Sequence, residues 1–318
     1  MSESVYIGVD VGATKILVGA VTQSGTILAS RRFNIQHESQ AATLQSIHDS
    51  LENFLGDWDR LTPRAIGIGL VGQIDPETGT WLEAMNLPIK SPVPLAGQVR
   101  DRFGIPVALD NDVHAAALAE ARWGIGTESN NFIYLNIGTG VSAGLVFGGQ
   151  LLRGSKNYAG ELGHMVVQPN GVLCPCGRRG CLEPIVSGGG MLAHVQQELV
   201  NHPDSTLHSF GDSLTTHEIF TASDSGDPLA GKLSNDAIQA LSIALTNLVN
   251  LLNPEWIVYG GGTLSDGWLI DHVRGNVETG PLPMIRKSLK GIIPSHLNPE
   301  QVGLLGAACL AMNLGGVK

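Results

Sequence analysis

One histidine and three cysteines lie within eighteen residues of this chain, at His164, Cys174, Cys176 and Cys181. Thiolate sulfur and imidazole nitrogen are preferred ligands of tetrahedral zinc, and one His with three Cys completes a structural site. Three glycines between positions 171 and 180 would let the loop fold back so that the four side chains converge. We therefore expect a zinc-binding loop. A redox or disulfide pair is the alternative, but the Cys-Pro-Cys spacing is one residue shorter than in thioredoxin-like motifs.

A second group of polar side chains, Asp110-Asn111-Asp112, follows an apolar segment. Residues 105–109 are typical of a strand, and the alanine-rich segment after them predicts a helix to about Arg122. In one interpretation Asn111 and Asp112 only cap this helix, since Asx residues dominate N-caps. In the other, the strand end projects into a ligand site. Asp112 would then accept a proton from a substrate hydroxyl, and Asn111 would bind a neighbouring group.

Two glycine turns occupy matching positions in two similar segments. YIGVDVGATKILVGAV at 6–21 aligns with FIYLNIGTGVSAGLVF at 132–147, which sets Asp10 on Asn136 and Gly12 on Gly138. Each segment is later followed by an apolar helix and a strand, at 44–55 and 65–70 and at 237–252 and 256–259. A repeat of such long period indicates a duplicated domain. Chance similarity between two glycine-rich hairpins is the alternative.

The glycine turns predict a nucleotide site. Backbone N–H groups in such turns form anion-binding concavities, so we expect phosphates between the two turns, in a cleft between two lobes. A strand follows each turn, which excludes the strand–loop–helix arrangement of dinucleotide and Walker loops. Asp10 is placed to hold Mg²⁺ directly or through water. A third turn, at 260–262, could pass under an adenosine, although any one turn alone could be an ordinary tight turn. The expected nucleotide-binding residues are Asp10, Gly12, Ala13, Thr14, Lys15, Gly138, Thr139, Gly140, Gly260, Gly261 and Gly262.

Composition sets the broad class of the protein. The 318 residues are 43% hydrophobic, which predicts a globular chain long enough for two domains. A formal charge of -10 argues against a nucleic-acid surface, which needs clustered Lys and Arg. No apolar run is long enough to span a bilayer, and the N-terminus MSESVYIGVD shows no signal peptide, so we expect a cytoplasmic protein without a membrane partner. Cys309, within LLGAACLAM, is expected to be a buried small hydrophobe.

Together the motifs resemble the ROK family of sugar kinases, within the actin-like ATPase superfamily, over essentially the whole chain. The supporting motifs are DVGATK at 10–15, LDND at 109–112, IGTG at 137–140, GELGH at 160–164 and CPCGRRGCLE at 174–183. The resemblance implies an α/β, two-lobed actin-like ATPase (ribonuclease H-like) fold with an interlobe cleft and a zinc-binding loop. We expect an N-terminal lobe of residues 1–112 plus 300–318 and a C-terminal lobe of residues 113–299.

The resemblance also implies roles for individual residues. Asp112 would be the catalytic base, and His164 would bind both zinc and sugar. Gly72 and Asn86 match family positions near the sugar, although both are equally consistent with ordinary loop residues. Ala13 departs from the glycine common in the family, which puts direct phosphate contacts of that turn in doubt. The expected sugar-binding residues are Gly72, Asn86, Asn111, Asp112, Glu161, His164 and Glu183.

The implied activity is ATP-dependent phosphorylation of a hexose, with Mg²⁺ and a structural Zn²⁺. We expect glucose to be converted to glucose 6-phosphate, because the motifs closely resemble those of bacterial glucokinases. The alternatives are an N-acetylhexosamine kinase, acting on N-acetylmannosamine or N-acetylglucosamine, and a fructose kinase. Members of the family are commonly dimers or tetramers, so the resemblance implies a homo-oligomer, and the sequence does not decide between these two states.

Two hypotheses from other functional classes are weaker. Sugar-responsive transcriptional regulators of the ROK family carry a helix-turn-helix segment ahead of the first strand, and only four residues precede Val5 here. We therefore expect no DNA-binding role. A sugar-binding protein without catalysis is opposed by the presence of both Asp10 and Asp112.

Overall fold

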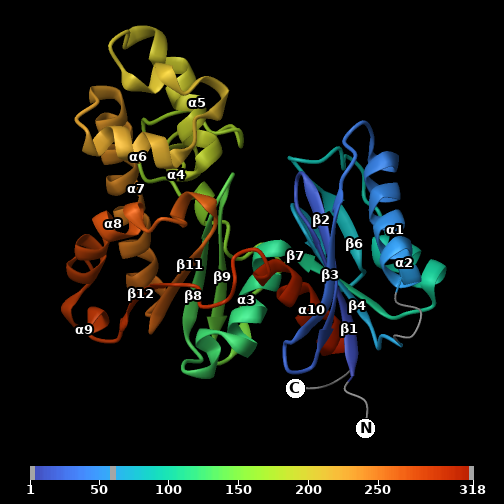
Figure 1. The fold of residues 1–318 in the computed structure, drawn as a ribbon. Coiled ribbons are helices and arrows are strands. Elements are labelled where there is room, and N and C mark those ends of the chain that lie inside the picture. Colours follow the sequence, from blue (N-terminus) through green and yellow to red (C-terminus); the bar gives the residue numbers. More distant parts are fainter. Residues whose placement is uncertain (1–3, 58–61, 315–318) are drawn as a thin grey trace. The chain divides into compact units, whose positions relative to one another are not determined.

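The computed structural model describes residues 4–57 and 62–314 (Figure 1). Two compact units are found in it. The first contains the described residues up to Asn130, Gly144–Ala159 and those from His296 onward, and the second contains Asn131–Ala143 and Gly160–Ser295. The first unit therefore takes in residues 113–130, which the sequence analysis assigned to the C-terminal lobe. The expected lobes and cleft stay predictions.

The elements follow one another in a repeated strand-and-helix order. The strands are β1 (Val5–Val11), β2 (Lys15–Thr22), β3 (Ile27–Asn34), β4 (Ile66–Leu70), β5 (Gln73–Asp75), β6 (Thr80–Glu83), β7 (Val107–Asn111), β8 (Phe132–Ile137), β9 (Val141–Phe147), β10 (Gln150–Leu151), β11 (Trp256–Gly260) and β12 (Gly291–Pro294). The α-helices are α1 (Gln40–Asp57), α2 (Leu95–Phe103), α3 (Asp112–Trp123), α4 (Glu183–Val186), α5 (Gly188–Glu198), α6 (Thr216–Asp224), α7 (Pro228–Leu252), α8 (Trp268–Thr279), α9 (Pro283–Arg286) and α10 (Val302–Leu314).

The two five-stranded sheets have the same topology. The first has the order β3-β2-β1-β4-β7, and the second has the order β10-β9-β8-β11-β12. In each, a tight glycine turn joins the central strand to the next strand along the chain, and the edge strand beyond that pairs antiparallel, β3 with β2 and β10 with β9. The other two strands of each sheet pair parallel, β4 and β7 beside β1, and β11 and β12 beside β8. Asp10 pairs with Gly69 on β4, and Asn136 holds the matching place opposite Gly260 on β11. This correspondence supports the predicted duplication.

The first sheet is covered on both faces. Strands β1, β2 and β4 are apolar nearly throughout, as expected for strands buried on two sides, whereas the edge strand β3 is largely exposed and carries Arg31 and Arg32. Side chains of α1 and α2 join one hydrophobic cluster with the sheet, and side chains of α3 and α10 join another. In Figure 1, α10 lies against β1 and β4. The last helix, α10, returns to the first part of the chain, within the segment 300–318 that the sequence analysis assigned to the N-terminal lobe.

Glycine allows α10 to approach the strands closely. A Cβ at Gly67 on β4 would lie 1.8 Å from the carbonyl oxygen of Ala307, and one at Gly8 on β1 would lie 2.5 Å from that of Leu304. The helix is itself made of small and apolar residues and is buried on nearly every side. Cys309 is 2% exposed on this helix, as expected for a small buried hydrophobe.

The second unit contains the longest helix, α7. Asp227 caps its N-terminus by accepting hydrogen bonds from Leu229 N and Ala230 N, and Pro228 occupies its first position. Asn253 ends it in a left-handed conformation with φ of 50°. In the part of the chain that the structure describes, no helix combines the length and apolarity that crossing a bilayer requires.

Candidate functional site

The carboxyl ends of three parallel strands gather acidic side chains in the first unit. The register of β1, β4 and β7 aligns Asp10 with Gly69 and Gly69 with Asp110, so Asp112 follows directly at the same edge. Burial, together with the negative charge of Asp10, raises the pKa of Asp112 to about 7. Burial also raises the pKa of Asp10 to about 6, partly offset by Lys15. A carboxyl group that titrates near neutrality is suited to accept a proton.

The Asp10 carboxylate is a candidate cation ligand. Among the residues that the structure describes, no side-chain hydrogen bond or ion pair engages it. Gly303 at the start of α10 leaves room for this carboxylate, since a Cβ there would lie 2.4 Å from Asp10 Oδ2. A buried carboxylate without a protein donor fits Mg²⁺, which favours carboxylate and water oxygens.

Asn111 both caps α3 and contacts Gly72, another of the expected sugar residues. Its Oδ1 accepts hydrogen bonds from Val113 N at 2.9 Å and His114 N at 3.2 Å, so the capping interpretation holds for this residue. Its Nδ2 donates to Gly72 O at 3.2 Å, which brings two of the expected sugar residues together. One N–H of the amide stays available to a ligand, so capping and binding are compatible.

The sequence analysis did not single out Asp110, which is the centre of a buried network. Its side chain is 0% exposed and accepts a hydrogen bond from Asn157 Nδ2 at 3.0 Å, and it forms an ion pair with Arg153. His114 Nδ1 lies 3.4 Å away, while His114 Nε2 contacts Ala159 O at 3.0 Å. Burial opposes the charge of Asp110, but hydrogen bonding from His114 and the charge of Arg153 outweigh it and lower the pKa.

This network connects β7 and α3 with the segment that leads to Glu161. Asn157 also donates to Ile74 O at 3.4 Å and holds a φ of 64°, a left-handed conformation that asparagine adopts more readily than most residues. Asp110 in turn accepts from the backbone N–H of Asn111 at 2.8 Å. Only the side-chain type of Asp110 and its place at the end of a buried strand could have marked it, because Arg153 and Asn157 lie more than forty residues away along the chain.

In the second unit, two of the three glycine turns lie together. A Cβ at Gly138 would lie 3.8 Å from Gly262 N, and Thr263 Oγ1 donates to Gly138 O at 3.2 Å. The start of α5 joins them, since Gly188 N also donates to Gly138 O, at 2.8 Å. Gly261 has a φ of 96°, and a Cβ there would lie 2.3 Å from Ile137 O. The sequence analysis did not include the start of α5 among the glycine turns. The run Gly188-Gly189-Gly190 could have indicated it.

Two expected sugar ligands differ in their surroundings. Glu183 Oε2 accepts a hydrogen bond from Val141 N at 2.9 Å, directly after the Gly138–Gly140 turn. A Cβ at Gly140 would lie 2.8 Å from that oxygen, so glycine lets the carboxylate rest against the turn. The Glu161 side chain is 57% exposed, and its Oε2 lies 3.9 Å from His164 Nε2.

The predicted zinc ligands converge. The ligand atoms of His164, Cys174, Cys176 and Cys181 all lie within 4.8 Å of one another. Cys176 Sγ is 3.7 Å from Cys181 Sγ, and Cys174 Sγ is 3.7 Å from His164 Nδ1. A tetrahedron with metal–sulfur bonds of about 2.3 Å has edges of about 3.8 Å, so the set fits zinc. Nδ1 faces the cysteines, which leaves Nε2 of His164 directed to Glu161.

The remaining expected site residues make few contacts with the others. Gly12 N donates to Lys15 O at 3.0 Å and closes the turn between β1 and β2, with Ala13 half-buried and Thr14 exposed. Asn86 is exposed between β6 and α2. Within the described ranges, no hydrogen bond joins the Asn86 side chain to the other expected sugar residues.

Comparison with known proteins then decides the family. The ROK family matches residues 6–313. The chain belongs to the ROK family. A glucokinase of Halalkalibacterium halodurans is 34% identical over 293 residues, which cover 90% of this chain and 88% of that protein.

Solved ROK structures share the α/β fold. A ROK family glucokinase from Streptomyces griseus, in complex with glucose and AMPPNP, is 30% identical, with a TM-score of 0.79 over 98% of this chain and 100% of the other. A ROK family transcriptional regulator, a homologue of the E. coli MLC protein, is 26% identical, with a TM-score of 0.86 over 98% of this chain and 79% of the other. The ROK fold thus serves both enzymes and regulators.

Proposed function

We propose that this protein is an ATP-dependent glucokinase that converts glucose to glucose 6-phosphate. The observation that carries the proposal is the Asn111–Asp112 pair at the end of β7, with the pKa of Asp112 raised to about 7 beside Asp10. A sugar-binding regulator has no need of a proton acceptor at this position. The ROK relative of 34% identity, itself a glucokinase, supports glucose as the acceptor.

Asp112 would act on the acceptor hydroxyl. As the hydroxyl oxygen forms its bond to the γ-phosphorus and the bond to the ADP oxygen breaks, the hydroxyl proton passes to Asp112. Asn111 Nδ2 would hold a neighbouring hydroxyl through its remaining N–H. Glu161, His164 and Glu183 would bind further hydroxyls, since each hydroxyl both donates and accepts. Gly72 and Asn86 would border the sugar.

The glycine turns would bind the nucleotide. The turns Gly12 to Lys15 and Gly138 to Gly140 would bind the phosphates through those backbone N–H groups that are not already engaged within the turn, as Gly12 N is by Lys15 O and Gly138 N by Gly140 O. Gly260 to Gly262 would pass beside the adenosine. Asp10 would hold Mg²⁺, which neutralises charge on the transferring phosphoryl group when bound. Val141 N is already committed to Glu183, so that N–H contributes nothing to phosphate binding.

Zinc would have a structural role. The four ligands fill a tetrahedral site without an open position for substrate, so the ion would stabilise the loop that carries His164 and leads to Glu183. Its bond to Nδ1 would fix the tautomer of His164, so that Nε2–H donates to a sugar oxygen or to Glu161. A cytoplasmic location and a homo-oligomer, either dimer or tetramer, stay predictions.

The deciding experiment is a coupled assay of ADP release with glucose, mannose, fructose, N-acetylglucosamine and N-acetylmannosamine. We expect the highest kcat/KM with glucose. The Asp112→Asn variant should lose about 10²- to 10⁴-fold in kcat while still binding glucose, since only the proton acceptor is removed. Asp101→Asn, an exposed change on α2, is the matched control and should keep wild-type turnover.

Each contrary result has a distinct meaning. A preference for an N-acetylhexosamine or fructose would overturn glucose as substrate and leave the kinase assignment intact. Absence of ADP release with every sugar would overturn the enzyme assignment. Near wild-type turnover in Asp112→Asn would remove this residue from the mechanism.

A further inference from the structure

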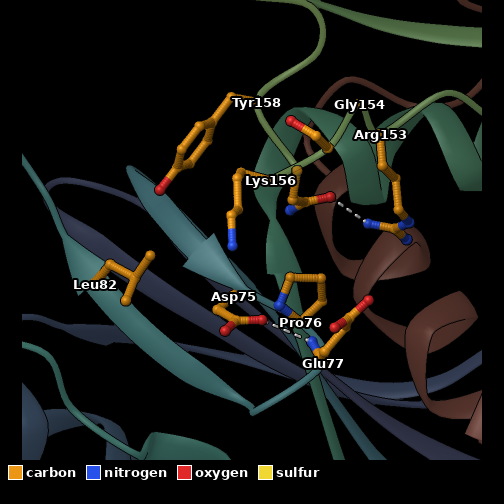
Figure 2. A pocket seen from close by; sticks show the side chains of 10 residues that line it. Asp75, Pro76, Glu77, Leu82, Arg153, Gly154, Lys156 and Tyr158 are labelled. Carbon is orange, nitrogen blue, oxygen red and sulfur yellow. Dashed lines mark hydrogen bonds between the residues drawn. The ribbon is translucent and has the colours of Figure 1, made fainter.

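A cavity of about 530 Å³ lies within the first unit, apart from every residue assigned above to sugar, nucleotide or metal (Figure 2). One wall is the β5–β6 hairpin, with Asp75, Glu77 and Leu82. The opposite wall is the segment after β10, with Arg153, Lys156 and Tyr158. Small-molecule sites in proteins range over about 300–1,000 Å³, so the cavity has room for a ligand of one or two sugar rings.

The two walls carry opposite and balanced charges. Asp75 and Glu77 face Arg153 and Lys156, which gives two groups of each sign. Asp110 and Asn157 already engage Arg153. Lys156 is different, because among the described residues no hydrogen bond or ion pair within 4.0 Å engages its ammonium group. In Figure 2 its side chain extends from the loop toward Asp75 across the cavity.

The carboxylate opposite Lys156 is held in place by its own hairpin. Asp75 Oδ1 accepts hydrogen bonds from Glu77 N at 3.0 Å and Thr78 N at 3.3 Å. The pKa of Asp75 is lowered, mainly by hydrogen bonding from Thr78 and to a smaller extent by the charge of Lys156. Asp75 is therefore ionised at neutral pH and offers acceptor oxygens, while Lys156 offers donors.

An aromatic and aliphatic surface completes the lining. The Tyr158 ring is 40% exposed at the cavity, and Pro76 and Leu82 add apolar surface. An exposed aromatic ring next to separated donors and acceptors suits a sugar ring, whose C–H face is apolar and whose hydroxyls each donate and accept. A strongly anionic ligand is disfavoured, because the two carboxylates would repel it.

We propose that this cavity is a binding site for a neutral mono- or disaccharide, separate from the phosphoryl acceptor. Hydroxyls donate to Asp75 and Glu77 and accept from Lys156, and the ring packs on Tyr158. Asn157 forms part of the lining and is held by Asp110 and Ile74, so this wall is preorganised. Binding here is independent of whether the protein transfers phosphate.

The test uses the full chain with the Asn111→Ala substitution, which weakens the expected acceptor site. Glucose and maltose are titrated by calorimetry and by ligand-observed NMR. We expect saturable binding of maltose, weakened about tenfold or more by either Tyr158→Ala or Lys156→Met. Leu152→Ala and Lys90→Met, exposed changes outside the cavity, are the matched controls and should leave the affinity unchanged. Tyr158→Phe keeps the ring and should keep most of the affinity even if Tyr158→Ala is unstable.

Three results would overturn the proposal. They are no binding of either sugar, binding that neither cavity variant changes, and displacement of maltose by glycine or inorganic phosphate with higher affinity. The last would identify a zwitterionic or anionic ligand instead. A protein that binds maltose through Tyr158 and phosphorylates no sugar would support this site while contradicting the proposed kinase activity, so the two failures are distinguishable.

Discussion

Three carboxyl groups at one strand edge differ in pKa because their partners differ. Asp10 and Asp112 are buried without a compensating cation in contact, and their pKa values rise. Asp110 is more deeply buried, yet its pKa falls because Arg153, His114 and Asn157 surround the charge. Burial alone therefore does not set the protonation state. The raised pKa of Asp112 suits a proton acceptor, and the lowered pKa of Asp110 keeps that neighbouring carboxylate charged so that it can hold Arg153.

The raised pKa of Asp112 predicts that the ionised carboxylate lowers the stability of the folded protein while serving its activity. The folded-state pKa lies above the unfolded value, so the folded protein binds the extra proton, and stability falls as pH rises from about 4 to 7. At pH 7.5 the Asp112→Asn variant should be more stable than wild type, on the order of 2 kcal/mol, while lacking turnover. Urea unfolding at pH 7.5 and 4.5 measures this. An unchanged difference at the two pH values would show that Asp112 is not destabilised by its charge.

Asp110 should behave in the opposite way. Asp110→Asn removes the charge that pairs with Arg153; because the Arg153 side chain is 35% exposed and water can solvate it, the expected cost is about 1–3 kcal/mol. Urea unfolding at pH 7.5 should show this loss, and Asp101→Asn provides the surface control. A loss below about 0.5 kcal/mol would mean that Arg153 finds equivalent solvation elsewhere.

Features built from residues close together in the sequence could be predicted, and features built from residues far apart in the sequence could not. The His164–Cys174–Cys176–Cys181 cluster could be predicted because all four residues fall in one short segment with spacing that only a few site types share. The strands, the glycine turns and the capped helix α3 followed from local patterns. The Asp110 network escaped because Arg153 and Asn157 come from a segment more than forty residues away. The cavity escaped for the same reason, since its walls are the β5–β6 hairpin and that distant segment.

The zinc-binding loop should contain about one metal ion per chain. Elemental analysis of the purified protein measures the zinc content, and Cys176→Ser should reduce it because one thiolate ligand is lost. Prolonged chelation should raise the KM for the sugar more than it changes the KM for ATP, since the ion holds the loop that carries His164. A metal-free protein with full activity would overturn the zinc assignment.

The two five-stranded sheets share one topology but carry different side chains at equivalent positions. Both sheets place a glycine turn after the central strand, but Asp10 occupies the first and Asn136 the equivalent position in the second. A carboxylate is present only at the copy where we propose the cation. Duplication thus supplied two similar frameworks, and single side chains give them different chemistry.

Close packing of α10 predicts that the first unit tolerates no side chain at Gly67. A Cβ there overlaps Ala307 O, so Gly67→Ala should destabilise by about 1–3 kcal/mol. Gly56→Ala, in an exposed helical position with no atom within 4 Å, should instead stabilise by about 0.5–1 kcal/mol. Thermal unfolding of both variants compares them. Equal stability for Gly67→Ala and wild type would show that α10 can shift at little cost.

The position of α10 also affects how the chain is made. Residues 302–314 are synthesised after the whole of the first sheet, yet they cover one face of its strands β1, β2 and β4. Until then, Tyr6, Leu17 and Val21 lack their native partners on that face. The nascent chain therefore exposes an apolar sheet surface from the synthesis of these strands until α10 follows, a period in which chaperone binding would protect it from aggregation.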